Sequence, residues 1–179
     1  MYTCSMISVF EEKLSELGLS YQVYPNDYYL LRHNNDTSRT VKVRLICSDQ
    51  ADESEYGSRN GNIFQSIGVF KFKLSCAETD TDFFILGFES ISNQKTDFVI
   101  IPTEEIKRRL VKKNRALTAN HRISIVFWLM DNRFLYDCSG VGAQWEWFYL
   151  SQGVNGRMAD GTEWDYSEFL NNWHRIMMK

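Results

Sequence analysis

Residues 82–114 read DFFILGFESISNQKTDFVIIPTEEIKRRLVKKN, and this stretch decides the fold of the chain. It holds two apolar runs, 82–89 and 97–102, each of the length of a buried strand. The second run ends at a proline, and residues 103–113 follow at once with the apolar spacing of an amphipathic helix. Thr103 is a residue type that caps helix N-termini. Two strands followed directly by a helix indicate an α/β protein.

The rest of the chain continues this mixture of helices and strands. Apolar spacing predicts helices over 5–17 and 165–177, with Asp165 as the cap of the second. Alternating or apolar patterns predict strands over 21–24, 28–32, 40–47, 68–75, 122–130, 133–137 and 145–150. We expect a turn at 25–27, a polar hairpin loop over 33–39 and a long loop over 48–62. No repeat or linker is evident, so residues 1–179 should form a single domain.

The composition fits one globular domain. The chain has 179 residues, of which 44% are hydrophobic and 24% are charged. The longest apolar run, 125–130, is far too short to cross a bilayer, so we expect no membrane partner. The four cysteines are widely spaced, which argues against a zinc site and favours free thiols. No signal peptide is recognised, and we therefore predict a soluble, cytoplasmic protein.

The charge is distributed unevenly along the chain. Seven basic and two acidic residues give residues 104–122 a net charge of +5. Because the whole chain has a net charge of −3, the remaining residues together carry −8. A basic block on an acidic protein is typical of a site that binds polyanions, although a solvated helix face has the same pattern. The candidates for contacts with the backbone of DNA or RNA are Lys107, Arg108, Lys112, Lys113 and Arg115.

Short sequence matches accompany this order of elements. They are LGLSYQVYP at 17–25, YYLLR at 28–32, VKVR at 41–44, DFFIL at 82–86, FVIIP at 98–102 and NNW at 171–173. With these matches the chain resembles the PD-(D/E)XK superfamily, which has the restriction-endonuclease-like fold. The resemblance implies a central mixed sheet flanked by helices and a nuclease ancestor that cut DNA or RNA with the help of Mg²⁺.

The resemblance places the metal-binding positions of the family on residues that do not suit them. The first carboxylate falls within Tyr29–Leu30–Leu31, so Asp27, two residues earlier, is the candidate substitute. The second acid falls at Lys42, and the lysine that activates water falls at Arg44. A cation at a ligand position repels Mg²⁺, and arginine stays protonated at neutral pH. Further candidate carboxylates are Glu11 and Glu12 on the first helix and Asp49, Asp52, Glu53 and Glu55 after the third strand.

We therefore expect a nucleic-acid-binding domain of nuclease descent, in which cleavage is doubtful and no cofactor is needed. Lys42 and Arg44 share one strand face, where they could pair with phosphate without cleaving it. Alternatively, they discourage association through a sheet edge. In a second hypothesis the protein is an active Mg²⁺-dependent endonuclease with relocated carboxylates, and its catalytic residues are Asp27, Lys42, Arg44 and Glu12.

A third hypothesis is a protein-interaction subunit that uses the aromatic C-terminal third of the chain. Trp145 and Trp147 would share one face of the strand over 145–150. An exposed aromatic face could stack on a base or form a protein interface, and a homo-oligomer is one form of such an interface.

Overall fold

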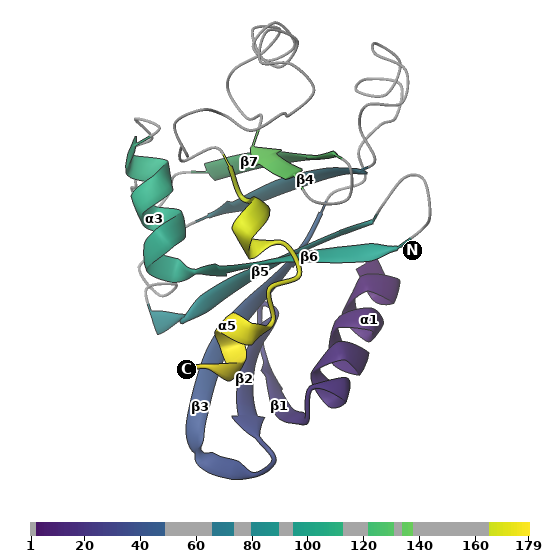
Figure 1. Cartoon of the computed structure of the whole chain (residues 1–179), viewed down its shortest axis with the longest axis vertical. Helices are drawn as coiled ribbons and strands as arrows, with labels where there is room; N and C mark the ends of the chain where they lie inside the picture. The colour runs from purple at the N-terminus through teal and green to yellow at the C-terminus, as the bar shows by residue number, and fades with distance from the viewer. Residues whose placement is uncertain are drawn as a thin grey trace, which may run out of the picture.

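The computed structural model of the chain describes residues 3–48, 66–73, 80–89, 95–112, 122–130, 134–137 and 165–179 (Figure 1). The helical elements are α1 (Thr3–Glu16), α3 (Thr103–Lys112), the 3-10 turn η2 (Ser167–Phe169) and α5 (His174–Met177). The strands are β1 (Leu19–Tyr24), β2 (Tyr28–His33), β3 (Asp36–Cys47), β4 (Ser66–Lys73), β5 (Phe83–Glu89), β6 (Thr96–Pro102), β7 (Arg122–Met130) and β8 (Phe134–Asp137).

The described strands form two sheets. A five-stranded sheet has the order β1-β2-β3-β5-β6, and a three-stranded sheet has the order β4-β7-β8. Strands β3 and β5 are parallel, with Val43 beside Phe83, whereas the other neighbours in the large sheet are antiparallel. The prediction of a mixed α/β protein with a central mixed sheet is confirmed. The strand predicted over 145–150 and most of the predicted loop over 48–62 lie outside the described residues.

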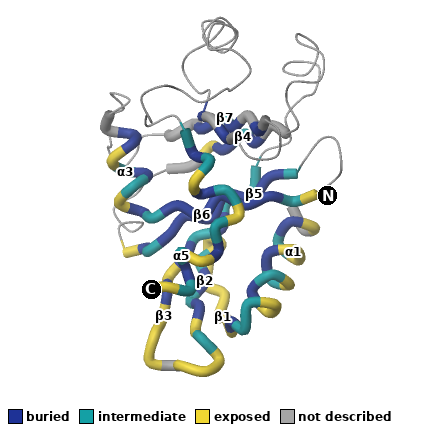
Figure 2. Tube along the Cα trace, viewed as in Figure 1, coloured by how far each residue is buried: buried dark blue, intermediate teal, exposed yellow. Residues whose placement is uncertain are grey.

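The large sheet is covered on both faces at β5 and β6, and each face has its own core. Phe83 and Ile85 pack with α1 and α5, whereas Phe84, Leu86 and Phe88 pack with the small sheet and α3. Successive side chains of a strand point to opposite faces, so a strand buried on both sides has an unbroken apolar sequence. Figure 2 shows β5 and β6 as the most continuously buried strands, and this is why the apolar runs in 82–102 predicted them well.

The hairpin between β1 and β2 has the turn that the sequence predicted. Asn26 and Asp27 both have a positive φ, of 63° and 60°, a conformation that Asn and Asp adopt more readily than other residues with side chains. The next hairpin is shorter than expected. Strand β3 begins at Asp36, so the polar loop predicted over 33–39 is wrong. Polar residues are compatible with a strand there because residues 38–40 are exposed to solvent.

The closing helix predicted over 165–177 is also wrong, because the chain leaves the helical conformation in its middle. Leu170 is extended with a ψ of 119°, and Asn171 has a φ of 49°. The Asn171 N–H donates to the carbonyl oxygen of Phe98 (2.6 Å), and its Oδ1 accepts the N–H of Phe98 (2.9 Å). These bonds continue the ladder at the β6 edge, and they replace the backbone bonds that a continuous helix would make.

The start of α3 differs from the prediction in one detail. Thr103 is the first residue of the helix, and its N–H donates to the carbonyl oxygen of Asp82 (2.9 Å). Its hydroxyl is buried and has no hydrogen-bond partner within the described part of the chain, so it does not act as the predicted cap. None of the helices in the described ranges is long and apolar enough to cross a membrane.

Candidate nucleic-acid interface

The three-stranded part of the large sheet, β1-β2-β3, has one face that the small sheet does not bury. The antiparallel register aligns its side chains in three rungs. All nine residues are exposed or half-buried. This set, which we call the open face, comprises Tyr24, Tyr28 and Arg44 in the first rung, Gln22, Leu30 and Lys42 in the second, and Ser20, Arg32 and Thr40 in the third.

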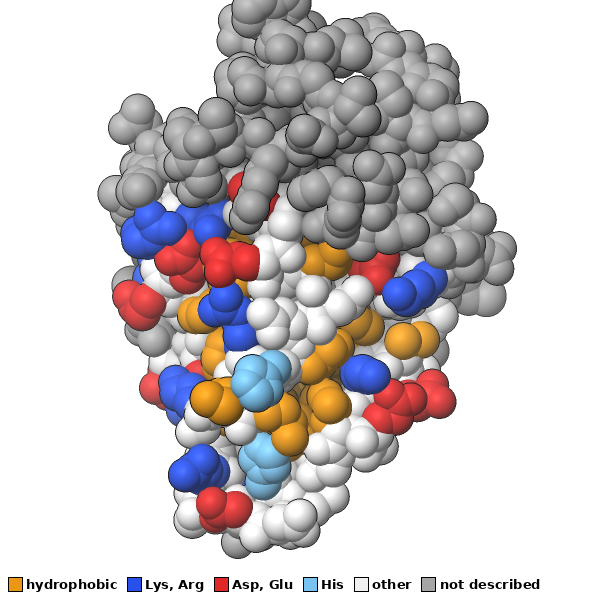
Figure 3. Space-filling model, viewed as in Figure 1, with side chains coloured by type: hydrophobic (Ala, Val, Ile, Leu, Met, Phe, Trp, Pro, Cys, Tyr) orange, Lys and Arg blue, Asp and Glu red, His pale blue; other side chains and the backbone are white. Residues whose placement is uncertain are grey.

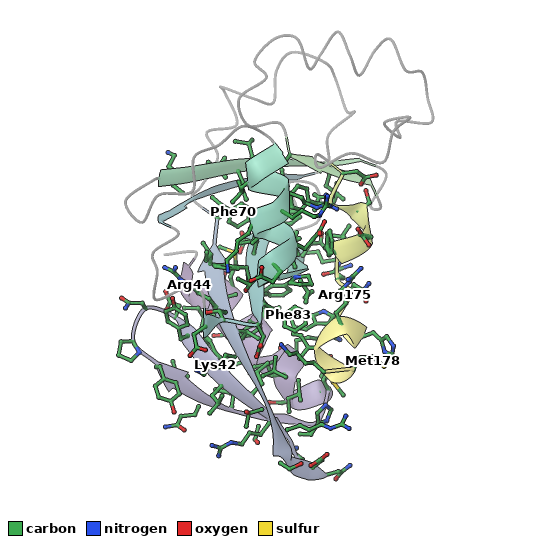
Figure 4. All side chains as sticks on the ribbon, turned by 90° about the vertical axis from the view of Figure 1, so that its left-hand side faces the viewer. Lys42, Arg44, Phe70, Phe83, Arg175 and Met178 are labelled. Carbon is green, nitrogen blue, oxygen red and sulfur yellow. The ribbon has the colours of Figure 1, made fainter. Side chains whose placement is uncertain are left out.

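The opposite face of the same strands is apolar. Tyr29 and Val43 are cross-strand neighbours there, and both are buried against α1 together with Leu31 and Val41. The alternation of the strands therefore separates a core side from a polar side on which lysine, arginine and tyrosine gather. The sequence analysis placed Lys42 and Arg44 on one strand face, and Figure 4 shows both side chains along β3.

Arg44 lies on an aromatic ring of the open face. Its guanidinium carbon is 5.3 Å from the centroid of the Tyr28 ring, and Tyr28 is its direct cross-strand partner. A guanidinium over a ring is held by a cation–π attraction, which is worth about 0.5–1 kcal/mol at exposed sites.

Lys42 lies at the end of the open face that is nearest to β5. Its Nζ pairs with the carboxylate of Asp80, although about half of the Lys42 side chain remains exposed (52%). The hydrogen bond that Lys42 donates to Asp80, together with the charge of Asp80, raises the pKa of Lys42. The backbone N–H of Lys42 donates to Asp82 Oδ2 (2.8 Å), and Asp82 also pairs with Lys179. The acidic groups at this end are thus already matched by lysines.

Asp27 and Glu12 have different surroundings from Lys42 and Arg44. Asp27 lies in the turn between β1 and β2, and its carbonyl oxygen accepts the N–H of Leu45 (3.0 Å). Burial raises the pKa of two groups on the α1 side of the sheet, Tyr29 and Cys47, and the charge of Asp27 adds to both shifts. Glu12 is exposed on α1.

Of the two neighbouring glutamates on α1, Glu11 contacts the sheet. Its Oε1 accepts a hydrogen bond from the Tyr29 hydroxyl (3.4 Å). Burial, followed by the charge and hydrogen bond of Glu11, raises the pKa of Tyr29 well above its usual range. The helical spacing from Ile7 could have identified Glu11 as the inward glutamate. The described residues contain no group of three or more His, Cys, Asp or Glu side chains that could hold a metal ion.

Cys47 is a free thiol at the end of β3. Burial raises its pKa to about 11, and the charge of Asp27 adds to the shift. Since the thiolate is the nucleophilic form, this cysteine is poorly reactive at neutral pH. Cys47 packs against the core on the α1 side of the sheet, and we assign it this structural role.

The cations of α3 are largely paired within the helix. Lys107 Nζ lies 2.8 Å from Glu104 Oε1, and Arg108 Nη2 lies 2.6 Å from Glu105 Oε1. Figure 3 shows blue and red side chains next to one another in the region of α3. The side chain of Lys112 and all of Lys113 and Arg115 lie outside the described residues, so their predicted phosphate contacts stay predictions.

Arg109 is a structural residue. It is 4% exposed, and its Nε donates to Glu105 (2.6 Å) while a second guanidinium nitrogen donates to the carbonyl oxygen of Asp165. The rings of Tyr166 and Phe169 lie 4.7 Å and 4.9 Å from its guanidinium carbon. Hydrogen bonds from Arg108 and Arg109 lower the pKa of Glu105 to about 2. This arginine therefore joins α3 to the C-terminal segment.

The sequence analysis missed the aromatic and third basic members of the open face, Tyr24, Tyr28 and Arg32. Their signal was present in the turn at 25–27, because a three-residue hairpin loop there sets Tyr24 opposite Tyr28. The fold and the face together define a mixed α/β domain with a basic, aromatic sheet surface. No protein-family model, curated protein or solved structure matches this chain.

Proposed function

We propose that the protein is a nucleic-acid-binding domain with a restriction-endonuclease-like fold, and that it contacts DNA or RNA through the open face without cutting it. The observation that carries the proposal is the placement of Arg32, Lys42 and Arg44 in three successive rungs of one solvent-facing sheet surface. Arginine and lysine are the residues that neutralise backbone phosphates.

The two tyrosines of the first rung support the same proposal. Tyr24 is 44% exposed although it is a large aromatic side chain, and it lies beside Tyr28, which carries Arg44 on its ring. Cations and aromatic rings side by side on one surface suit a polymer that has both phosphates and bases. Lys107 and Arg108 of α3 are each paired with a glutamate, as Lys42 is with Asp80, so it is the exposed tyrosine beside the cations that favours the open face.

The loss of cleavage follows from the resemblance to the PD-(D/E)XK superfamily. Lys42 stands where that superfamily has a metal-binding acid, and Arg44 stands where it has a lysine that activates water. On the open face these two side chains are suited to pair with phosphate oxygens, and Arg44 cannot accept a proton from water at neutral pH. The acidic residues 49, 52, 53 and 55 lie outside the described residues.

Two assays of the full chain test this proposal, one for binding and one for cleavage. We expect labelled DNA or RNA strands of mixed sequence to bind at about 50 mM salt, with an affinity that falls steeply as salt rises. Supercoiled plasmid incubated with Mg²⁺ should remain uncut. If the plasmid were nicked in a Mg²⁺-dependent reaction that Asp27→Ala abolishes, the proposal would be wrong and the hypothesis of an active endonuclease would be supported.

The interaction-subunit hypothesis has no specific support in the described residues. Tyr166, Phe169 and Trp173 of the aromatic C-terminal third are buried in the two cores. Trp145 and Trp147 lie outside the described residues. A chain that binds neither DNA nor RNA at low salt would overturn the nucleic-acid proposal.

A further inference from the structure

We infer that the open face selects single-stranded nucleic acid, whose unpaired bases stack on Tyr24 and Tyr28. This inference rests on the proposed function and specifies its ligand. Each base has an apolar ring face, which a single strand can place on an aromatic side chain. In a duplex those ring faces are already stacked on neighbouring bases, and a protein meets only phosphates and base edges.

The aromatic part of the face has the arrangement that stacking needs. Tyr24 and Tyr28 are direct cross-strand partners, so their side chains start about 5 Å apart on the same surface. Tyr24 is 44% exposed, and Tyr28 is half-buried with the Arg44 guanidinium 5.3 Å from its ring centroid. A base placed on Tyr24 would therefore have a second ring and a planar cation beside it.

The cations of the open face extend over three successive rungs beside the tyrosines. Lys42 and Arg44 are two residues apart on β3, and Arg32 lies opposite Thr40 in the next rung. Two residues of a β-strand span about 6.6 Å, so the three cations offer phosphate contacts along the face while the bases of a single strand reach the rings of the first rung.

The charge of the face is complementary to a polyanion. None of its nine residues is acidic, and three of them are Arg or Lys. The carboxylates at its end, Asp80 and Asp82, are paired with Lys42 and Lys179. A second copy of the chain would bring the same positive charges to the interface, so self-association through this face is disfavoured.

The inference is tested by the anisotropy of a labelled oligothymidine strand and of a hairpin duplex, each titrated with the full chain. We expect the single strand to bind at least about tenfold more tightly than the duplex, and Tyr24→Ala to weaken its binding about tenfold. Tyr24→Phe, which keeps the ring, should bind as the wild type does.

Tyr21→Ala is the matched control. Tyr21 belongs to the same strand, is 37% exposed, and faces the opposite side of the sheet beside Tyr29. The Tyr21→Ala variant should therefore bind the single strand with the same affinity as the wild type. An equal loss in Tyr21→Ala and Tyr24→Ala would overturn the assignment of the stacking surface.

Three further outcomes would overturn the inference in distinguishable ways. Equal or tighter binding of the duplex would remove the selection of single strands but leave the proposed function intact. Failure to bind either oligonucleotide, as DNA or as RNA, with a native circular dichroism spectrum, would remove both. A wild-type dimer in light scattering that Tyr24→Ala dissociates would identify the open face as an interface between copies of the chain.

Discussion

Arg44 and Tyr28 are direct neighbours across the β2–β3 ladder, and the guanidinium carbon of Arg44 lies 5.3 Å from the centroid of the Tyr28 ring. The ring holds the cation on the face that we propose binds nucleic acid. An ammonium group on a flexible stem cannot reproduce this arrangement.

Arg44→Lys should therefore weaken single-strand binding about fivefold even though it preserves the charge. Arg44→Ala should weaken it further and also reduce its dependence on salt, because one phosphate contact is lost. Anisotropy titrations at several salt concentrations measure both effects. Wild-type affinity in Arg44→Lys would show that the stacked guanidinium is not used.

Asp80→Asn should strengthen binding. Asp80 pairs with Lys42 and competes with phosphate for it, and because the pair is exposed its effect is small. Its removal should lower the dissociation constant of the complex by up to about fivefold. The matched control is Glu16→Gln, which makes the same change of charge at the Lys13 ion pair on α1. An equal gain in both variants would indicate a general effect of net charge.

Asn171 should matter for stability. Its side chain accepts the N–H of Phe98 (2.9 Å) and donates to Asp97 (2.7 Å), and its φ of 49° is left-handed. Asn171→Gly should lower the free energy of unfolding by about 2 kcal/mol through the lost hydrogen bonds. Asn171→Ala should lower it by about 1 kcal/mol more, since alanine is strained in that conformation.

Urea denaturation measures these changes. Asn172→Ala serves as the control, because Asn172 makes one exposed hydrogen bond to the backbone at Glu168 and should cost less than about 0.5 kcal/mol. Equal losses at the two positions would contradict the role of Asn171 at the β6 edge.

Glu105 should make stability depend on acid pH. Its pKa is lowered to about 2 in the folded protein from an ordinary value of 4.5, so its stabilising effect is complete above pH 4.5 and is lost as the pH falls from 4.5 towards 2. Glu105→Gln should cost about 2 kcal/mol at neutral pH, because Arg108 and the buried Arg109 lose a charged acceptor.

The variant should also lose less stability than the wild type between pH 4.5 and 2. Glu104→Gln is the control, since Glu104 is 84% exposed and pairs with Lys107 alone among the interactions described for it. Its effect at neutral pH should stay below about 0.5 kcal/mol. The free energy of unfolding is measured by denaturation at several pH values. If it fell equally between pH 4.5 and 2 in Glu105→Gln and in the wild type, this account would be contradicted.

The elements that the sequence predicted best are the strands that are buried on both faces of the sheet. Strands β5 and β6 are buried on both faces, so their unbroken apolar runs mark them directly. The closing segment misled because its apolar residues have helical spacing but serve two different cores. Tyr166 and Phe169 pack in one core and Trp173 and Ile176 in the other, and the change of direction at Asn171 connects them.

The candidate site was in large part available from the sequence. That Lys42 and Arg44 share a face follows from the period of a strand. The predicted loop over 33–39 sets Arg32 opposite Thr40 and therefore Tyr28 opposite Arg44, which is the observed register. The contact of the Arg44 guanidinium with the Tyr28 ring depends on side-chain conformation, which a residue pattern does not specify. The pairing of the α3 cations was available from sequence, because glutamates precede Lys107 and Arg108 by three residues.

The salt dependence of single-strand binding by Lys42→Gln, compared with the wild type, tests the central claim most directly. Lys42 is an exposed cation of the open face, and Lys13→Gln on α1 is the control for net charge. We predict that Lys42→Gln weakens binding and reduces the slope of log affinity against log salt by about 0.7, while Lys13→Gln leaves the slope unchanged. Wild-type affinity and slope in Lys42→Gln would contradict the claim that the open face binds phosphate.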